Sequence, residues 1–404
     1  MPSRCGAIVV GAGPAGTAAA ITLARAGVDV HVFDKARFPR DKCCGDGLTT
    51  LALRELERLG FDPGTVPGWF PVGSAVLCSP SGREVRVPLV GDGTYAATAP
   101  RRELDAALVG LARGAGAQVH EGWTFTGRGD DGTLRFTDGT TAITVDAPHV
   151  VAADGMWSPL RKAFGAALPD YRGEWHAFRQ YARNVTGPAA NDLIVWFEAD
   201  LLPGYAWSFP LPDGRANIGF GVLRDGSRSV QDMAALWRDL LARPHVVAAL
   251  GQGFELEGRH TAWPIPARVD SIALTAGTAL FVGDAAAATD VLTGEGIGQA
   301  LETGRLAAEA IVAGGDVAGA YAGAVARHLF ADHRMSRRLG RVLAHRRGAG
   351  GALRIVEMSG GWGRRNFARW MFEDEPRAIA LTPRRWHRRV LRRPGAYVSR
   401  SAAR

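Results

Sequence analysis

The chain has 404 residues, of which 47% are hydrophobic and 22% are charged, average proportions for a folded protein that exclude wholesale disorder. No stretch approaches the roughly 18 unbroken apolar residues that a membrane-spanning helix requires. The net charge of +8 conceals a split, because residues 327–404 hold 20 Lys+Arg against 5 Asp+Glu and residues 1–326 hold 28 against 35. The basic C-terminal part indicates a negatively charged partner, either nucleic acid or a membrane surface.

The four cysteines bear on the compartment in which the protein works. Cys5, Cys43, Cys44 and Cys78 are too few for a disulfide framework, and no Cys/His cluster has the spacing of zinc ligands. We therefore expect a protein of a reducing, cytoplasmic setting without a metal site.

The segment that opens the chain has the layout of a dinucleotide-binding unit. A buried strand is expected at Ala7–Val10, and a turn with Gly11, Gly13 and Gly16 follows it. A helix over Thr17–Ala26, a second strand over Val28–Phe33 and the acidic Asp34 come next. The first two glycines permit a tight turn and close approach of the backbone to a pyrophosphate, and the third lets the helix pack on the strand. The helix dipole favours the phosphates, and Asp34 can accept hydrogen bonds from ribose hydroxyls.

Two later segments are interpreted as returns of the chain to the same ligand. A strand at Val150–Ala153 leads into Asp154, and a strand at Ala279–Val282 leads into Asp284. A glycine-rich turn and a helix over Gln299–Ala313 follow the second of these. Each aspartate alone is equally typical of a turn or a helix cap. Together with the first motif they indicate FAD, whose ribityl chain a carboxylate can bind and whose ring a helix amino terminus can approach.

The three motifs are GAGPAG, AADG at 152–155 and VGDAAAA at 282–288. They resemble the three sequence motifs of the group A flavoprotein monooxygenase-type (para-hydroxybenzoate hydroxylase-like) superfamily. More narrowly, the chain resembles the geranylgeranyl reductase family. The matching segments are RDKCCGDGL at 40–48, PRRELDAALVGLARGAGA at 100–117, and YAWSFP at 205–210 with a following Gly-Phe-Gly. Two departures are Val291, where the family often has proline, and Asp34, where glutamate is commoner.

The nucleotide motif and the resemblance together imply a set of FAD contacts. They are Gly11, Gly13, Ala15, Gly16, Asp34, Lys35, Cys44, Gly45, Gly47, Arg101, Phe125, Asp154, Asp284, Gly296 and Ile297. Arg101 opens a helix to about Ala115, from which its guanidinium could reach a phosphate or ribose oxygen or remain solvated. The thiol of Cys44 could shield the flavin, donate a proton or simply pack.

A substrate-binding sheet is predicted between the second and third FAD segments. Its antiparallel strands are expected at Ala177–Asn184, Leu193–Glu198, Tyr205–Leu211 and Arg215–Leu223. Period two puts Tyr205, Trp207 and Phe209 on one face, which suits a prenyl chain or quinone ring but is also typical of ordinary core. The resemblance adds Gly219 and Gly221 to this substrate-binding set.

We predict an α/β fold in which a Rossmann-like FAD-binding domain is interleaved with a mixed or antiparallel β-sheet substrate domain and followed by C-terminal helices. The FAD-binding domain takes residues 1–70, 97–165 and 270–323, the substrate domain takes 71–96 and 166–269, and the basic helical region takes 324–404. A last helix is expected from about Pro383. The basic region is interpreted as a solvated face or as a surface for anionic lipid, since no motif favours nucleic acid, and little of the binding chemistry is expected to depend on it.

The function predicted is an FAD-dependent oxidoreductase that reduces a C=C bond of a prenyl or isoprenoid-quinone substrate, with Cys44, Tyr205 and Trp207 as catalytic residues. Cys44, Tyr205 or bound water are the candidate proton sources. The alternatives are a monooxygenase (hydroxylase or epoxidase) or halogenase acting on an aromatic or terpenoid metabolite, and a flavin-binding sensor or carrier. The substrate is a hydrophobic small molecule or lipid, and the electron donor is NAD(P)H or a reductase or ferredoxin. The expected location is cytoplasmic or peripheral on the inner face of the membrane.

Overall fold

The apolar run near the start of the chain lies at the centre of a six-stranded sheet in the computed structural model, which describes residues 2–224, 230–379, 382 and 393–398. All four residues of β1 (Ala7–Val10) are buried, as expected for a parallel strand that is covered on both faces. The strands run in the order β18 (Thr275–Ala276), β19 (Ala279–Phe281), β12 (Val150–Ala152), β1, β2 (Val30–Asp34) and β8 (Gln118–Glu121). Every pair is parallel except β18 with β19. The predicted α/β fold is confirmed.

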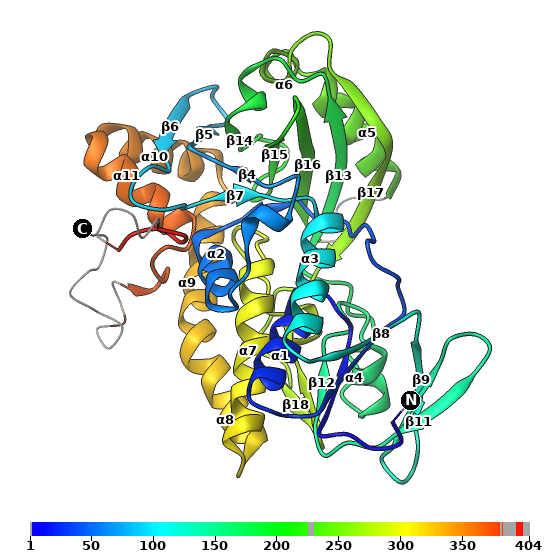
Figure 1. Ribbon diagram of the computed structural model, residues 1–404. Coiled ribbons are helices and arrows are strands. Elements are labelled where there is room, and N and C mark those ends of the chain that lie inside the picture. Colours follow the sequence, from blue (N-terminus) through cyan, green and yellow to red (C-terminus); the bar gives the residue numbers. More distant parts are fainter. Residues whose placement is uncertain (1, 225–229, 380–381, 383–392, 399–404) are drawn as a thin grey trace, which may run out of the picture.

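Two helices far apart in the sequence pack together beside this sheet. They are α1 (Pro14–Arg25) and α7 (Ile297–Ala313), which run side by side in Figure 1. Gly304 allows this approach, since a Cβ on it would lie 2.0 Å from the carbonyl oxygen of Ala15 in α1. Gly16 lets α1 pack on the turn after β1, since a Cβ there would lie 1.8 Å from the carbonyl oxygen of Gly11. Close packing of helix on helix and helix on strand therefore needs glycine at both positions.

A three-stranded antiparallel sheet and several helices complete this half of the molecule. Phe33 of β2 stacks on Phe136 of the small sheet at a centroid distance of 4.1 Å, so the small sheet covers β2. The elements are β9 (Thr124–Arg128), β10 (Leu134–Thr137), β11 (Ala142–Val145), α2 (Thr50–Arg58), α3 (Arg101–Gly114), α4 (Pro159–Ala163) and α8 (Val317–Val325).

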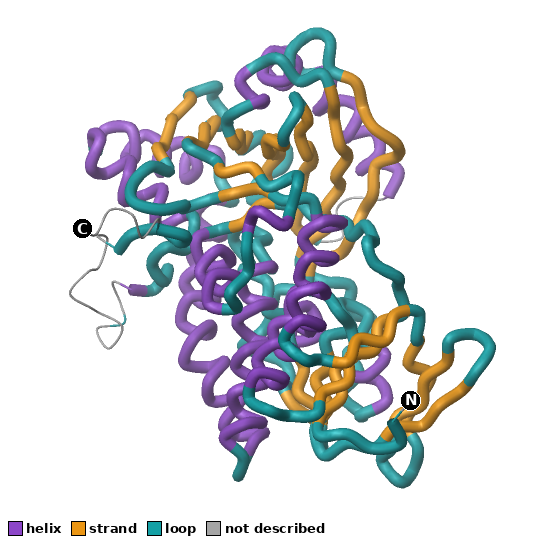
Figure 2. The backbone as a smooth tube through the Cα atoms, in the orientation of Figure 1, coloured by secondary structure: helices purple, strands orange, loops and turns teal. Residues whose placement is uncertain are grey.

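A seven-stranded sheet forms the second half, at the top of Figures 1 and 2. Its order is β17 (Glu255–Ile265), β13 (Trp175–Arg183), β16 (Arg215–Leu223), β15 (Tyr205–Leu211), β14 (Leu193–Trp196), β5 (Ser74–Cys78) and β6 (Glu84–Pro88). The four strands predicted from the sequence are present, and the sheet is mixed because β14 pairs with β5 in parallel. The edge strand β17 was not predicted, because its residues are mostly polar and solvent-facing.

Helices cover one face of the seven-stranded sheet and leave the other for a ligand. Trp237 and Leu240 of α5 (Val230–Ala242) pack with Phe220 and Phe178 of the sheet. Next to them lies α6 (Pro244–Leu250). A short sheet of β3 (Gly47–Leu48), β7 (Ala97–Thr98) and β4 (Phe70–Pro71) joins the two halves.

The basic C-terminal region packs on the body of the protein. Its helices α9 (Ala331–Leu343), α10 (Arg346–Met358) and α11 (Gly360–Met371) lie along the left edge of Figure 1. Leu353 and Val356 of α10 are buried with Val85 and Val87 of β6. No helix among the described ranges is both long enough and apolar enough to cross a bilayer. The helix expected from about Pro383 falls outside the described residues.

Candidate active site

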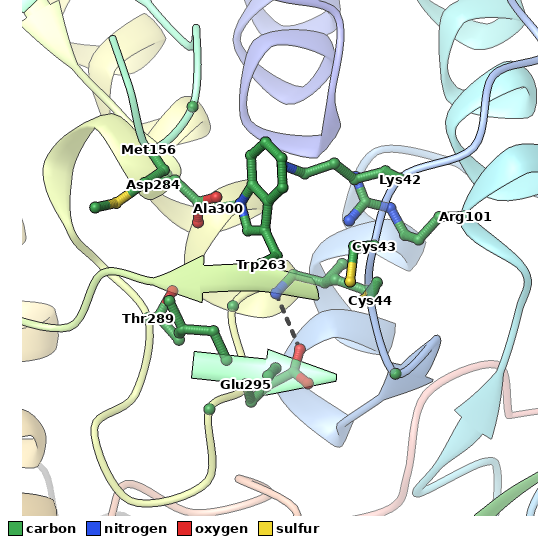
Figure 3. Close-up of a pocket in the computed structure, with 18 of the residues that line it drawn as sticks. Lys42, Cys43, Cys44, Arg101, Met156, Trp263, Asp284, Thr289, Glu295 and Ala300 are labelled. Carbon is green, nitrogen blue, oxygen red and sulfur yellow. Dashed lines mark hydrogen bonds between the residues drawn. The ribbon is translucent and has the colours of Figure 1, made fainter. Parts of the chain in front are cut away.

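A continuous cavity of about 1010 Å³ is lined by residues from both large sheets. It begins at the carboxyl ends of β1 and β2, passes the loop at residues 42–47, and ends among apolar side chains of the seven-stranded sheet. Figure 3 shows its middle part, where Lys42 points toward the Trp263 ring, and Asp284 and Glu295 come from two other segments. The length and mixed lining suit two ligands placed end to end.

The nucleotide end is built by the segment that the sequence singled out. The Asp34 carboxylate accepts hydrogen bonds from the backbone N–H groups of Ala12 and Ala36, both at 2.7 Å, which fix it at the end of β2. A Cβ on Gly13 would meet only the Arg40 guanidinium within 4 Å, at 3.7 Å, so this backbone is open to the cavity. The arrangement fits the ribose and pyrophosphate of a dinucleotide.

Fourteen of the fifteen predicted FAD-contact residues line the cavity. They are Gly11, Gly13, Ala15, Asp34, Lys35, Cys44, Gly45, Gly47, Arg101, Phe125, Asp154, Asp284, Gly296 and Ile297. Gly16 lies beneath the wall, where it serves the packing of α1 described above.

The two aspartates after β12 and β19 differ in what holds them. Both oxygens of Asp154 are engaged, by the Ser158 hydroxyl at 2.6 Å and the Leu160 N–H at 2.9 Å, so this side chain caps α4. Burial raises the pKa of Asp154 to about 6. The Asp284 carboxylate has no hydrogen-bond partner among the described residues and lines the cavity. An unpartnered acceptor at this position suits the hydroxyl groups of a ribityl chain.

Arg101 is held within its own helix. Its Nε and Nη2 atoms each donate to Asp105 at 2.8 Å, and Arg40 contacts the same carboxylate at 2.9 Å. Two guanidinium groups therefore share one buried carboxylate, which leaves one net positive charge beside the nucleotide end. That excess favours a pyrophosphate. Arg40 and Asp105 were not predicted, because the pairing joins a loop to a helix more than sixty positions away.

The loop at residues 42–47 is fixed to the seven-stranded sheet by Asp46, which is fully buried. Its carboxylate accepts hydrogen bonds from the Tyr181 hydroxyl at 2.6 Å, the Asn217 amide at 2.8 Å and the Arg101 N–H at 3.2 Å. The Asn217 amide also donates to the carbonyl of Cys44 at 2.8 Å. Burial raises the pKa of Asp46 to about 6, while these hydrogen bonds oppose the shift. These hydrogen bonds fix the position of Cys44 in the cavity wall.

The thiol of Cys44 is protonated at neutral pH. Burial raises its pKa to about 12, and its sulfur accepts a 3.4 Å hydrogen bond from the Asp46 N–H. Lys42 stands on the same loop, with Nζ 3.5 Å from the ring centre of Trp263, and burial lowers its pKa. The RDKCCGDGL segment at 40–48 contained the signal for Lys42, although its side chain was not assigned a role.

Tyr205, Trp207 and Phe209 form a row on the cavity face of β15, as period two predicts. Neighbouring ring centres are 6.0 Å apart in both pairs. Trp207 donates its Nε1–H to Asn217 at 3.2 Å, and the Tyr205 hydroxyl donates to the carbonyl of Thr293, in the loop before α7. Burial raises the pKa of Tyr205 above its ordinary value.

The two glycines of the predicted substrate set have different positions. Gly221 lines the cavity, whereas Gly219 lies opposite Trp207 in the β15–β16 pairing and does not. A Cβ on Gly219 would lie 2.4 Å from the Trp207 ring. Gly219 therefore makes room for the indole and is placed behind the wall.

The far end of the cavity is apolar and is closed by the C-terminal helices. Its lining includes Leu77, Val87, Leu193, Val195 and Phe197 from the sheet, with Leu343, Met371 and Phe372 from α9 and α11. The expectation that little of the binding chemistry depends on the basic region is therefore wrong. Leu343 of α9 and Met371 of α11 complete the cavity wall with apolar side chains.

Glu295 is a further residue of this site that the sequence analysis missed. Its Oε1 atom accepts from the N–H groups of Ile297 at 3.0 Å and Gly298 at 3.4 Å, at the start of α7. Oε2 has no hydrogen-bond partner among the described residues, and the side chain lines the cavity. Burial raises the pKa of Glu295 to about 7, so both protonation states are populated near neutrality. The glycines around it drew attention to the backbone of this turn rather than to its carboxylate.

A segment after α11 holds the same turn from the other side. Arg377 pairs with Asp290 at 3.3 Å, and Glu373 accepts hydrogen bonds from Thr49 at 3.0 Å and Gln299 at 2.8 Å. Burial alone would raise the pKa of Asp290, but Arg377 and hydrogen bonds lower it. Burial raises the pKa of Glu373 to about 8. Residues 373–377 therefore join the C-terminal region to the turn that carries Glu295.

Replacing Glu373 by glutamine should weaken the pH dependence of stability. A carboxyl whose pKa is about 8 when folded and 4.5 in the unfolded chain binds its proton more tightly in the folded state. Its contribution is fully present below pH 4.5 and is lost as the pH rises through about 8. As the pH rises from about 5.5 to about 8.5, deprotonation of this group should lower the free energy of unfolding by on the order of 3 kcal/mol. Urea unfolding of the wild type and Glu373→Gln at both pH values measures the difference.

The control for this experiment is Glu84→Gln, since Glu84 is exposed on β6. In this variant the free energy of unfolding should change with pH as it does in the wild type. A Glu373→Gln variant whose free energy of unfolding changes with pH as steeply as that of the wild type would contradict the assignment.

Comparison with known proteins agrees with this geometry. Residues 4–313 match a family model described as an FAD binding domain. The chain is 34% identical over 370 residues to a menaquinone reductase of Mycolicibacterium smegmatis, covering 85% of each chain. It is 31% identical over 309 residues to digeranylgeranylglycerophospholipid reductase 2 of Methanopyrus kandleri, covering 75% of each.

A solved structure is similar over almost the whole chain. A geranylgeranyl bacteriochlorophyll reductase-like protein from Thermoplasma acidophilum superposes with a TM-score of 0.77 at 20% identity, covering 95% of this chain and 100% of the other. FAD is the cofactor that the cavity is built to hold, and the protein is an FAD-dependent oxidoreductase. The chain belongs to the FAD binding domain family and, within it, to the geranylgeranyl reductase family.

Proposed function

We propose that the protein reduces a C=C bond in the isoprenoid chain of a quinone or other prenyl lipid. The observation that carries the proposal is the continuation of the FAD cavity, without a break, along the row of Tyr205, Trp207 and Phe209 to an apolar end. An aromatic row and aliphatic walls suit a flat ring and a branched hydrocarbon chain. The names of the mycobacterial and archaeal relatives support the same substrate class.

Reduced FAD, when bound, supplies a hydride to one carbon of the double bond. The residues that would hold it are those of the nucleotide end, with Asp284 toward the ribityl chain. The chain itself must then orient the substrate, exclude water and supply a proton to the second carbon.

The proton source that we propose is Glu295, in place of Cys44 or Tyr205. The Cys44 thiol, with its pKa of about 12, is a weak acid. The Tyr205 proton is already donated to a carbonyl. Glu295, with its pKa of about 7 and Oε2 free of a described partner, can hold a proton in the cavity and release it. Tyr205 then acts as a positioning residue, because its hydroxyl anchors the turn that carries Glu295.

The test is an anaerobic single turnover. The purified holoprotein is reduced with dithionite, mixed with a menaquinone or a geranylgeranyl lipid, and followed by flavin absorbance and product mass. Flavin reoxidation is the expected result, with a product whose isoprenoid chain has gained two hydrogen atoms. For menaquinone the mass is measured after air has oxidised any quinol back to the quinone, so that reduction of the ring is not counted. A reaction that requires O₂ and adds oxygen or halogen to the product would replace this proposal with the monooxygenase or halogenase alternative.

A further inference from the structure

The junction of α10 and α11 carries an unusual concentration of exposed apolar side chains. Ile355, Met358 and Trp362 are 72%, 74% and 72% exposed, which makes them the three most exposed large apolar residues in the described part of the chain. All three fall within eight consecutive positions. Exposed apolar residues that are scattered singly need no explanation, but a cluster of this kind marks an interaction surface.

Helix geometry places arginines beside these apolar residues. On α10, Arg347, Arg354, Ile355 and Met358 fall within about 100° of arc at 100° per residue. Leu353 and Val356 occupy the opposite face and are buried. The helix therefore has an inner apolar face on the protein and an outer face of mixed apolar and basic character.

The charge on this outer surface is strongly one-sided. Residues 346–365 contain five arginines, Arg346, Arg347, Arg354, Arg364 and Arg365, and a single acidic residue, Glu357. Glu357 pairs with Arg83 of the body. None of the five arginines forms an ion pair with another residue in the described ranges. We call Arg347, Arg354, Ile355, Met358 and Trp362, with the neighbouring arginines, the α10–α11 face.

We propose that the α10–α11 face binds the surface of an anionic lipid bilayer, with Ile355, Met358 and Trp362 entering the interface and the arginines contacting headgroups. Apolar side chains combined with unpaired arginines are what an interfacial helix requires. A second copy of the chain is disfavoured as the occupant, because a symmetric contact would bring arginine against arginine. The inference rests on the proposed function only in that a lipid substrate would be drawn from that bilayer.

The same helices connect this face with the apolar end of the cavity. Met371 and Phe372, at the end of α11, line the cavity, and Leu353 and Val356 pack in one cluster with the cavity-lining Val87. Figure 1 shows α10 and α11 at the outer edge of the molecule, next to β5 and β6. Docking through the α10–α11 face would therefore hold the apolar end of the cavity close to the source of the substrate.

Vesicle flotation of the full-length holoprotein tests this assignment without any need for turnover. Phosphatidylcholine vesicles with phosphatidylglycerol should bind the wild type, pure phosphatidylcholine vesicles should bind it much less, and high salt should release it. Two variants, Ile355→Ser/Met358→Ser/Trp362→Ser and Arg347→Glu/Arg354→Glu, should each lower partitioning at least about tenfold. Because these side chains are exposed, folding should be unaffected, as thermal unfolding can verify.

Matched controls come from exposed residues elsewhere. Leu256→Ser/Val312→Ser and Arg102→Glu/Arg259→Glu remove the same kinds of side chain from other surfaces and should bind like the wild type. The proposal would be overturned if the wild type did not bind anionic vesicles. It would also be overturned if the control variants lost as much vesicle binding as the variants of the α10–α11 face. Self-association of the wild type that the triple serine variant abolishes would overturn it as well. Vesicle binding without substrate reduction would leave this proposal standing and refute only the proposed function.

Discussion

Glu295→Gln is expected to slow reduction of the substrate double bond by about 10²-fold or more, which is the usual contribution of a positioned general acid. Glutamine keeps the shape of the side chain and can still accept the backbone hydrogen bonds at the start of α7. FAD content and stability should therefore remain close to those of the wild type. Single-turnover flavin reoxidation, measured anaerobically with saturating substrate, gives the rate.

The pH profile separates a proton donor from a merely structural residue. With a pKa of about 7, wild-type Glu295 is protonated below that pH, so the rate should be constant there and fall about tenfold per pH unit above it. The glutamine variant should lose this dependence. Cys44→Ser and Tyr205→Phe serve as comparisons that should keep the wild-type profile. If Glu295→Gln reacts normally and Cys44→Ser does not, the thiol is the proton source.

Gly16→Ala is expected to abolish FAD retention. The added methyl group would lie 1.8 Å from the carbonyl oxygen of Gly11, which is backbone and cannot turn aside. Helix α1 would have to move away from the glycine turn that faces the pyrophosphate. Overpacking of this kind costs about 1–3 kcal/mol or more. The flavin absorbance per chain after purification, together with the unfolding temperature, measures both effects.

The matched control is Gly110→Ala in α3. Apart from its chain neighbours and the backbone of its own helix, no atom lies within 4 Å of the position its Cβ would take. An alanine within a helix is favoured over glycine by roughly 0.5–1 kcal/mol. This variant should bind FAD and be as stable as the wild type or slightly more so. Normal flavin content in Gly16→Ala would show that the turn tolerates a displaced helix.

The elements that local patterns specify were predicted well. The six-residue glycine motif, the acid that ends β2 and the alternation in β15 each depend on neighbours a few positions apart. Strand bounds at Tyr205–Leu211 and Arg215–Leu223 agree with the structure residue by residue. The apolar periodicity of these segments is enough to place them, because one face of each must be buried.

The parts of the site that were missed depend on contacts between distant segments. Asp46 and Asn217 are 171 positions apart, and Thr49 and Glu373 are 324 apart. The periodicity of a single helix or strand does not indicate which distant residues will form such a pair. Glu295 was missed for a related reason: the turn that carries it is held by Tyr205 of the seven-stranded sheet and by Arg377 of the C-terminal segment, and neither contact can be inferred from the turn alone.

The joining of residues 373–377 to the flavin turn has a consequence for biosynthesis. The glycine motif leaves the ribosome first, whereas α7 and, after it, the segment that holds Glu373 are made much later. Contacts of such long sequence separation form late, because the loops between them must close first. A growing chain that has not yet reached α7 lacks part of the wall of the flavin cavity, so we expect it not to retain FAD. Cofactor capture is then a late event of synthesis, and products truncated before α7 should be colourless.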